Sequence, residues 1–306
     1  MNYKGKKGVD VSSNNGNIDF EKIKKAGFDF VMIRCGYGSD YLSQDDTFFE
    51  ENVKKCEAVG MPWGAYLYSY ACDDEAARSE VKHIARMLKG KKPLFPLALD
   101  IEDSDGYHER HGGWNKKTID SVAKIFINGM RELKYYPMLY VGFEEVKNLI
   151  SRDTLKSVDI WWAQWWKVCE IPDYLTLGVW QYGGEVNYLE SNSIDGVGII
   201  DKNFSYQDYP TIIKSGGFNG WKKPEEKILD KYGYVKGNSS IGVLALKELL
   251  LMAKKKGIIS QAVDKNNIFG DGTEKAVNQL LMKYGYIPNG IAGLNFIALL
   301  TAALKI

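Results

Sequence analysis

The sequence has few of the residues that build metal sites and disulfide frameworks. Its 306 residues include three histidines and four cysteines, which are Cys35, Cys56, Cys72 and Cys169. The cysteines are widely spaced, without a C-x-x-C pair and without histidines at metal-binding intervals. This pattern argues against zinc and favours free thiols that pack as small hydrophobic residues. We expect no metal and no organic cofactor.

Long apolar runs and an excess of one charge are also missing. No run approaches the ~18 apolar residues of a membrane-spanning helix, and residues 1–7 lead into a strand-like segment without the apolar core of a secretory signal. A formal net charge of +1 gives no case for nucleic acid. The composition, 45% hydrophobic and 26% charged, excludes a disordered chain. We therefore expect no nucleic acid and no membrane among the partners, and the oligomeric state is left open.

Charge is distributed unevenly along the chain. From Lys222 onward there are 13 basic and 7 acidic residues, whereas the first 221 residues hold 27 basic and 32 acidic ones. Where the two parts meet, residues 215–224 are rich in glycine and lack apolar periodicity, which is typical of a linker. The sequence thus predicts a first domain at 1–214, a linker at 215–224 and a second, basic domain at 225–306.

The first domain alternates strand and helix patterns. Short apolar or aromatic runs predict strands at 8–11, 28–34, 63–70, 94–101, 137–141, 160–164, 178–182 and 198–200. Helical patterns lie between the early runs, at 19–26, 46–59, 74–88 and 116–133, and His83 in the third of them is expected at the surface. Eight strands with helical crossovers indicate an α/β fold, an irregular (β/α)8-type barrel, with a doubly wound open sheet as the alternative. Connections after Trp166 are short, so the late part should be irregular.

The second domain is predicted to be small and all-α. Amphipathic patterns at 243–256 and 273–284 and a largely apolar stretch at 294–304 indicate three helices.

Four acidic residues end or interrupt the predicted strands. Asp10 lies in the first strand, Asp100 and Glu102 close the fourth, and Asp201 follows the last. Residues two apart on a strand point the same way, so Asp100 and Glu102 share a face. Because the carboxyl ends of barrel strands meet at one mouth, we expect all four groups to converge.

Such a cluster favours acid catalysis. Crowded carboxylates cannot all ionise, so one keeps its proton near neutral pH and can serve as a general acid beside anionic stabilisers. Glycoside hydrolysis requires this pairing. Two alternatives are open: clustered carboxylates also hold Mg²⁺ or Ca²⁺, and acids at strand ends can be merely solvated.

Taken in order, the motifs of residues 5–205 resemble those of glycoside hydrolase family 25, the Chalaropsis-type lysozymes common in bacteriophage endolysins. The motifs are Gly8-Val9-Asp10-Val11-Ser12-Ser13, Val31-Met32-Ile33-Arg34, Gly60-Met61-Pro62-Trp63-Gly64, Asp100-Ile101-Glu102, Trp161-Trp162-Ala163-Gln164, Trp180-Gln181-Tyr182 and Asp201-Lys202-Asn203. The resemblance implies a flattened β/α barrel that cleaves the β-1,4 bond between N-acetylmuramic acid and N-acetylglucosamine in peptidoglycan.

The resemblance also implies a role for each acid. Glu102 would be the general acid that protonates the leaving oxygen, and Asp100 would orient the substrate's 2-acetamido group. Asp10 and Asp201 would complete a negative floor that stabilises oxocarbenium-like charge. The side chains implied to line the groove and bind substrate are Arg34, Tyr41, Tyr66, Tyr140, Trp162 and Gln181. The stereochemical course is left open, with substrate assistance preferred over inversion.

The chain departs from the family pattern in two places. Leu67 follows Tyr66 where the family often has histidine, and the insert at 107–114, after the Asp-x-Glu strand, is longer than usual. We interpret the insert as a groove-side loop that shapes substrate preference. His108 and His111 within it have no further ligand pattern and do not indicate a metal.

The second domain resembles a wall-binding module. Residues 268–277 are similar to the core of peptidoglycan-binding-like three-helix domains, and Asn289-Gly290-Ile291-Ala292-Gly293 replaces their later Asp-Gly-x-x-Gly. Its basic charge suits anionic wall polymers. The alternatives are a merely soluble helical domain and a dimerisation element.

The combined prediction is a peptidoglycan hydrolase, an N-acetylmuramidase with lysozyme activity. As an endolysin of a Gram-positive host, it would be made in the host cytoplasm without a signal peptide and act at the cell wall after release; a bacterial autolysin would have the same features. The alternatives are a non-catalytic cell-wall-binding protein on a decayed barrel and a glycosidase acting on chitin-like polymers.

Overall fold

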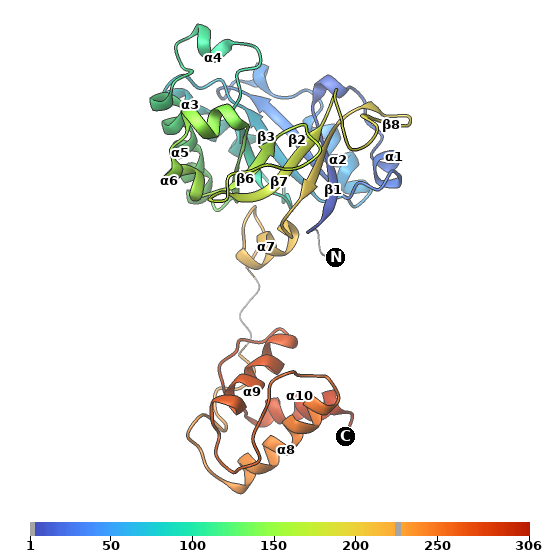
Figure 1. Ribbon diagram of the computed structural model, residues 1–306, viewed down its shortest axis with the longest axis vertical. Coiled ribbons are helices and arrows are strands. Elements are labelled where there is room, and N and C mark those ends of the chain that lie inside the picture. Colours follow the sequence, from blue (N-terminus) through green and yellow to red (C-terminus); the bar gives the residue numbers. More distant parts are fainter. Residues whose placement is uncertain (1–3, 224–227) are drawn as a thin grey trace. The chain divides into compact units, whose positions relative to one another are not determined.

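The computed structural model describes residues 4–223 and 228–306, which belong to two compact units (Figure 1). The first unit spans Met1–Pro224 and the second Glu225–Ile306. In the described part of the chain, no helix combines the length and apolar character needed to cross a membrane.

The first unit is built on a closed eight-stranded barrel. Its strands are β1 (Lys6–Val11), β2 (Phe30–Tyr37), β3 (Trp63–Tyr68), β4 (Leu97–Asp100), β5 (Pro137–Val141), β6 (Asp159–Ala163), β7 (Thr176–Gly183) and β10 (Asp201–Ser205). They follow one another around the barrel in the order β1-β10-β7-β6-β5-β4-β3-β2. The predicted α/β barrel is confirmed, and the open sheet is excluded.

The eighth strand differs from the prediction. Residues Gly198–Ile199 form β9, which pairs with β8 (Ser193–Ile194) in a separate two-stranded ladder. The barrel is closed instead by β10, which runs antiparallel to both of its neighbours, β7 and β1. The connection from β7 to β10 holds the β8–β9 ladder and no helix, and a parallel crossover usually needs a helix, so the chain returns antiparallel.

Helices cover the outside of the barrel. The early ones are α1 (Phe20–Lys25), α2 (Phe49–Ala58), α3 (Asp74–Met87) and α5 (Lys116–Glu132), and they confirm the four predicted helical segments. Shorter segments are η1 (Ser13–Asn15), η2 (Leu42–Gln44), α4 (Tyr107–Arg110), the π-helix η3 (Glu145–Leu149) and α6 (Arg152–Lys156). The apolar stripe of α5 is buried throughout, which is why this helix docks on the barrel.

Side chains alternate between two apolar layers. Outward residues such as Val31 and Ile33 pack under the helices, whereas inward residues such as Phe30 and Met32 fill the barrel. Helix α7 (Tyr209–Gly216) closes the amino end of the strands, where the Tyr209 ring lies 5.5 Å from that of Phe95 (Figure 1). The opposite mouth of the barrel therefore receives the last inward residue of each parallel strand.

Residues 217–221 are part of the first unit, although the sequence analysis assigned them to a linker. Asn219 is fully buried at φ 54°, and its side chain accepts a hydrogen bond from the Tyr136 backbone N–H (2.9 Å) and donates to the Phe95 carbonyl (3.0 Å). The Trp221 indole N–H donates to the Lys92 carbonyl (3.2 Å). The glycines of this segment serve its turn geometry and do not mark a linker.

The four cysteines are free thiols. Cys35 and Cys56 are buried, as expected, whereas Cys72 and Cys169 are half-buried. Burial raises the pKa of the Cys35 and Cys56 thiols, which keeps both in the protonated form.

The second unit contains helices α8 (Ile241–Lys255), α9 (Asp271–Lys283) and α10 (Leu294–Leu304), close to the three predicted. Their inner faces form one apolar cluster that includes Leu246, Leu280 and Leu300. Local polar contacts fix the ends: the Ser240 hydroxyl caps α8, and the buried Asp230 carboxylate accepts from the backbone N–H of Phe296 (2.7 Å) in the first turn of α10.

Candidate active site

The barrel mouth brings the four predicted acids together. Asp10, Asp100, Glu102 and Asp201 line one cavity of about 270 Å³. Asp100 is the last residue of β4, whereas Asp201 is the first residue of β10. Both reach the same mouth because β10 runs antiparallel, so its amino end lies where the parallel strands have their carboxyl ends.

Most of the other predicted site residues also line this cavity. They are Arg34, Tyr66, Tyr140 and Gln181, at inward positions of β2, β3, β5 and β7. Tyr41 does not contribute to its lining: it is 65% exposed, just before η2. Trp162 lies in the outer apolar layer, with its ring 4.8 Å from that of Phe143. Because side chains alternate along β6, the neighbouring Trp161 faces the cavity instead.

Asp10 and Asp201 form a directly opposed carboxyl pair. They are register partners in the β1–β10 ladder, and their side chains hydrogen-bond to each other. The Asp10 carboxylate also accepts from Asn203 Nδ2 (2.7 Å) and Gln181 Nε2 (3.1 Å). Burial raises the pKa of Asp10 to about 6, against the lowering effect of these donors. Burial and the Asp10 charge raise the pKa of Asp201 to about 8, so at neutral pH Asp201 holds the shared proton.

Asp100 and Glu102 form the second carboxyl pair. Burial, followed by the Glu102 charge, raises the pKa of Asp100 well above its ordinary value. Asp100 lines the cavity, and its Oδ1 is buried and has no hydrogen-bond partner among the described residues. Burial raises the pKa of Glu102 to about 7, and the charge on Glu145 is the next contribution.

The environment of Glu102 is the one that a general acid needs. Its carboxyl group is only partly buried and lines the cavity, so a substrate can reach it. A pKa of about 7 keeps a large fraction protonated at neutral pH while still permitting proton release. The nearby Asp10 carboxylate, which is held by two amide donors, supplies negative charge that can stabilise a cationic transition state.

Some residues of the site were not predicted as site residues by the sequence analysis. Asn203 is fully buried two residues after Asp201 on the same inward face, and it accepts from the Trp161 indole (2.7 Å) while donating to Asp10. Because side chains alternate along a strand, an inward Asp201 predicts that Asn203 also points inward. Glu145 is buried at the start of η3, where it accepts from the Gly142 backbone N–H (2.8 Å). No sequence pattern singles it out from its neighbour Glu144. The remaining unpredicted lining residues are Ser12, Asn14, Asn15, Tyr68 and Ser104.

Arg34, which lines the cavity, is held by the segments that follow β1 and β2. Its Nε donates to Asp46 Oδ2 (2.9 Å), and its Nη2 donates to the Ser13 hydroxyl (2.9 Å). The Asp46 side chain is fully buried and also accepts from the Ser13 backbone N–H (2.9 Å). Arg34 is therefore fixed in direction before any substrate arrives.

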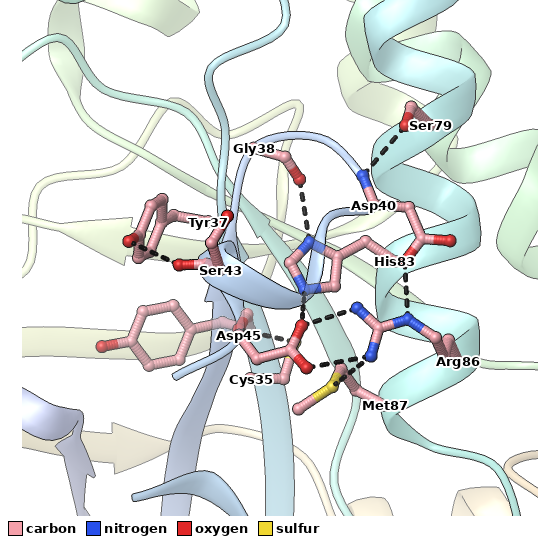
Figure 2. A network of polar contacts seen from close by, with 11 residues as sticks. Cys35, Tyr37, Gly38, Asp40, Ser43, Asp45, Ser79, His83, Arg86 and Met87 are labelled. Carbon is pink, nitrogen blue, oxygen red and sulfur yellow. Dashed lines mark hydrogen bonds and ion pairs between the residues drawn. The ribbon is translucent and has the colours of Figure 1, made fainter. Parts of the chain in front are cut away.

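A polar network on α3 anchors the same loop (Figure 2). His83 lies between the Gly38 carbonyl (3.0 Å from Nδ1) and the Asp45 carboxylate (2.9 Å from Nε2), and Arg86 binds Asp45 and Asp40 (Figure 2). The expectation of a surface position for His83 is wrong: the side chain is fully buried because it ties the loop at 38–45 to α3.

Comparisons with known proteins agree with this geometry. The sequence model described as glycosyl hydrolases family 25 matches residues 9–190. An autolytic lysozyme of Clostridium acetobutylicum is 26% identical over 191 residues, which are 62% of this chain and 52% of that protein. The family resemblance drawn from the motifs of the barrel is thereby confirmed.

Solved structures share the fold. The modular autolysin LytC from Streptococcus pneumoniae, in complex with a synthetic peptidoglycan ligand, has a TM-score of 0.56 and 24% identity, over 66% of this chain and 47% of its own. The CTP1L endolysin has a TM-score of 0.57 and 17% identity over 98% of both chains. The chain spans about half the length of the autolytic lysozyme and of LytC.

The protonated state of Asp201 predicts a stabilising substitution. Between the ordinary pKa of an aspartate and about 8, folded Asp201 keeps a proton that the unfolded chain has released, so its ionisation opposes folding increasingly as the pH rises through this window. Asparagine has no charge and can still donate to Asp10. We expect Asp201→Asn to raise the free energy of unfolding by about 1 kcal/mol at pH 7 and by nothing at pH 3, as measured by urea denaturation.

Asp195→Asn, at an exposed residue of the same segment, is the matched control and should leave the free energy of unfolding unchanged. A loss of stability in Asp201→Asn at pH 7 would show that Asp201 is ionised in the folded protein.

Proposed function

The chain belongs to the glycosyl hydrolases of family 25, and on that premise we propose that it is an N-acetylmuramidase. It hydrolyses the β-1,4 bond between N-acetylmuramic acid and N-acetylglucosamine in peptidoglycan. The observation that carries the proposal is the barrel mouth itself, where a half-buried Glu102 with a pKa of about 7 lies in one cavity with Asp10, Asp100 and Asp201.

Each carboxyl group has a separate task in this reaction. Glu102 donates its proton to the glycosidic oxygen as the bond to the anomeric carbon breaks. The ionised Asp10, paired with the protonated Asp201, stabilises the positive charge that develops on the sugar ring. Asp100 lines the cavity, and its Oδ1, which has no partner among the described residues, accepts a hydrogen bond from the N–H of the 2-acetamido group. The acetamido carbonyl, oriented in this way, attacks the anomeric carbon.

The names of similar proteins support this substrate. One relative is an autolytic lysozyme, and a structural neighbour was solved with a synthetic peptidoglycan ligand. The finer proposal is that the chain is an endolysin directed at a Gram-positive host. It is supported by the CTP1L endolysin, which is similar in fold over almost the full length of both chains.

The second unit is proposed to bind the cell wall. From Lys222 onward basic residues outnumber acidic ones by 13 to 7, which favours anionic wall polymers. A unit that stays attached to a polymeric substrate raises the effective concentration of the barrel at the glycan strands without new catalytic contacts.

The acid role of Glu102 predicts the outcome of its removal. Purified Gram-positive peptidoglycan is incubated with the wild type and with Glu102→Gln, and the new reducing ends are identified. We expect muramic acid ends from the wild type and a rate lower by ~100-fold or more in the variant, because glutamine cannot donate the proton. Glu109→Gln, at an exposed position, serves as the control and should keep full activity.

The other outcomes identify the alternatives. Glucosamine ends would mean cleavage of a different bond, and release of sugar from chitin without action on walls would mean a chitin-type glycosidase. A wild type that sediments with the wall without cutting it would be a binding protein on an inactive barrel.

Glu145 predicts a shift in the pH dependence. Its charge raises the pKa of Glu102, so Glu145→Gln should lower that pKa. The acid must be protonated to act, and the high-pH limb of the rate profile should therefore move to lower pH by about 0.5. The measurement is the initial rate of wall hydrolysis between pH 4 and 9. Glu144→Gln, at the exposed neighbour, should leave the limb in place; an unmoved or upward-moved limb in Glu145→Gln would contradict the electrostatic coupling.

Wall binding by the second unit predicts a salt dependence. The full chain carrying Glu102→Gln is sedimented with purified walls at increasing NaCl. We expect the bound fraction to fall several-fold between about 0.05 and 0.5 M salt, because the attraction of a basic domain to anionic polymers is screened. Walls stripped of anionic polymers should bind less at low salt. A bound fraction that does not respond to salt or to stripping would exclude this mode of attachment.

A further inference from the structure

A second cavity continues from the carboxylate-lined one. It has a volume of about 320 Å³ and is lined by Asn14, Arg34, Tyr37, Tyr68, Tyr70, Ser104 and Asp105. Asn14, Arg34, Tyr68 and Ser104 line both cavities. A polymer that occupies the first cavity therefore extends directly into the second. We call this second space the tyrosine cavity.

The tyrosine cavity presents aromatic rings. The rings of Tyr37 and Tyr68 lie 6.0 and 5.2 Å from the ring of Tyr70, with edge-to-face geometry. Tyr107, from the insert after β4, continues the series at 4.5 Å from Tyr70. Aromatic clusters of this kind are common in protein cores, but here the rings are only half-buried.

The hydroxyl groups of the three lining tyrosines are already bonded within the protein. Tyr70 donates to Asp105 Oδ2 (2.7 Å), Tyr68 shares a hydrogen bond with Ser104 Oγ (3.0 Å), and Tyr37 donates to the Ser43 carbonyl (3.2 Å; Figure 2). What the tyrosines can offer a ligand is therefore mainly their ring surface.

The segments next to the lining residues Tyr70 and Asp105 are held in place by hydrogen bonds. His108 is fully buried and bonds to the Ser69 carbonyl (2.9 Å), and Asp103 accepts from the backbone N–H of His108 (2.8 Å). On the other side, Tyr70 is fixed by its backbone N–H, which donates to the buried Glu80 (2.7 Å). A wall fixed before binding loses little conformational entropy when a ligand arrives.

We propose that the tyrosine cavity is a sugar subsite, which binds one N-acetylated hexose ring of the glycan strand beyond the bond that is cut. The inference rests on the proposed function and specifies how far along the glycan strand the protein binds its substrate. Ring faces carry partial negative charge and suit the C–H face of a sugar, while Asp105 and Ser104 can accept hydrogen bonds from its hydroxyl groups. The volume lies at the small end of the range for ligand pockets, which fits a single ring.

The charges of the cavity favour sugar over stem peptide. Among the residues that the structure describes, Arg34 is the one cation in the lining, and it is paired with Asp46. Asp105 adds a carboxylate whose pKa is lowered by the hydrogen bond from Tyr70, so it is ionised at neutral pH. A peptide stem that carries carboxylates would meet repulsion here without a free cation to bind it.

The test compares oligosaccharides of increasing length. Alternating N-acetylglucosamine–N-acetylmuramic acid di-, tetra- and hexasaccharides without peptide are titrated calorimetrically into the full chain carrying Glu102→Gln, which cannot cut them. Tyr70→Leu removes the ring, whereas Tyr70→Phe keeps the ring and loses the hydroxyl. We expect Tyr70→Leu to weaken the longest ligand that binds by about tenfold, and Tyr70→Phe by less than about twofold. Disaccharide affinity should stay the same in both variants.

Two further variants separate binding from folding. Tyr37→Leu removes a second ring from the same cavity and should reproduce the length-dependent loss. Tyr135→Leu, at a half-buried tyrosine just before β5 and therefore at the opposite end of the barrel, should leave all affinities unchanged. Thermal unfolding of each variant shows whether the barrel is intact.

Three outcomes would overturn the proposal: equal affinities in all variants, an equal loss for the disaccharide and the hexasaccharide, or a loss seen only when the same saccharides carry stem peptides. The last would assign the cavity to peptide. These titrations measure binding and do not need turnover. A wild type that produced no muramic acid ends would contradict the proposed function, whereas the subsite would still be tested by the titrations.

Discussion

The electrostatic conflict at the barrel mouth is the constraint on which the rest of the site depends. Asp10 and Asp201 face each other across the β1–β10 ladder. Because both carboxyl groups are at least partly buried and close together, they cannot both be ionised at neutral pH, so they share a proton. Asn203 and Gln181 hold the charge on Asp10, and Trp161 in turn orients Asn203. Because Asp201 holds the shared proton, the Asp10 carboxylate is an anion with a defined position. Its environment differs from that of Glu102, which can therefore act as the acid.

The direction of the closing strand β10 is what brings these groups together. Parallel strands place their last inward residues at one mouth, and a parallel eighth strand would contribute only its carboxyl end. Antiparallel β10 brings its first residues to this mouth, and Asp201 and Asn203 enter side by side on the inward face, both within reach of Asp10. The return from β7 to β10 without a helical crossover thus supplies a carboxyl group and its amide partner together.

Local patterns predicted much of this structure, and tertiary geometry decided the rest. Apolar periodicity gave seven barrel strands and the covering helices, and strand-end position gave the four acids. Trp162 was assigned to the groove in place of Trp161 because a motif match does not state the face of a strand, whereas the pleat does. His83 could not be placed from sequence, since its burial depends on a loop that folds back from a distant segment. Glu145 could not be placed either, because no sequence pattern separates it from the exposed Glu144. Composition misjudged Asn219 for the same reason as His83: its partners lie over 80 residues away.

The docking of residues 217–221 has a consequence for modular exchange between such proteins. Because Asn219 satisfies backbone groups before β4 and β5, the barrel needs this segment as its own final turn. A recombination point upstream of Gly217 would leave those groups buried and unbonded in the recipient barrel. Viable chimaeras should therefore inherit the chain through Trp221 from the barrel parent, and a different second unit can be joined only beyond that junction.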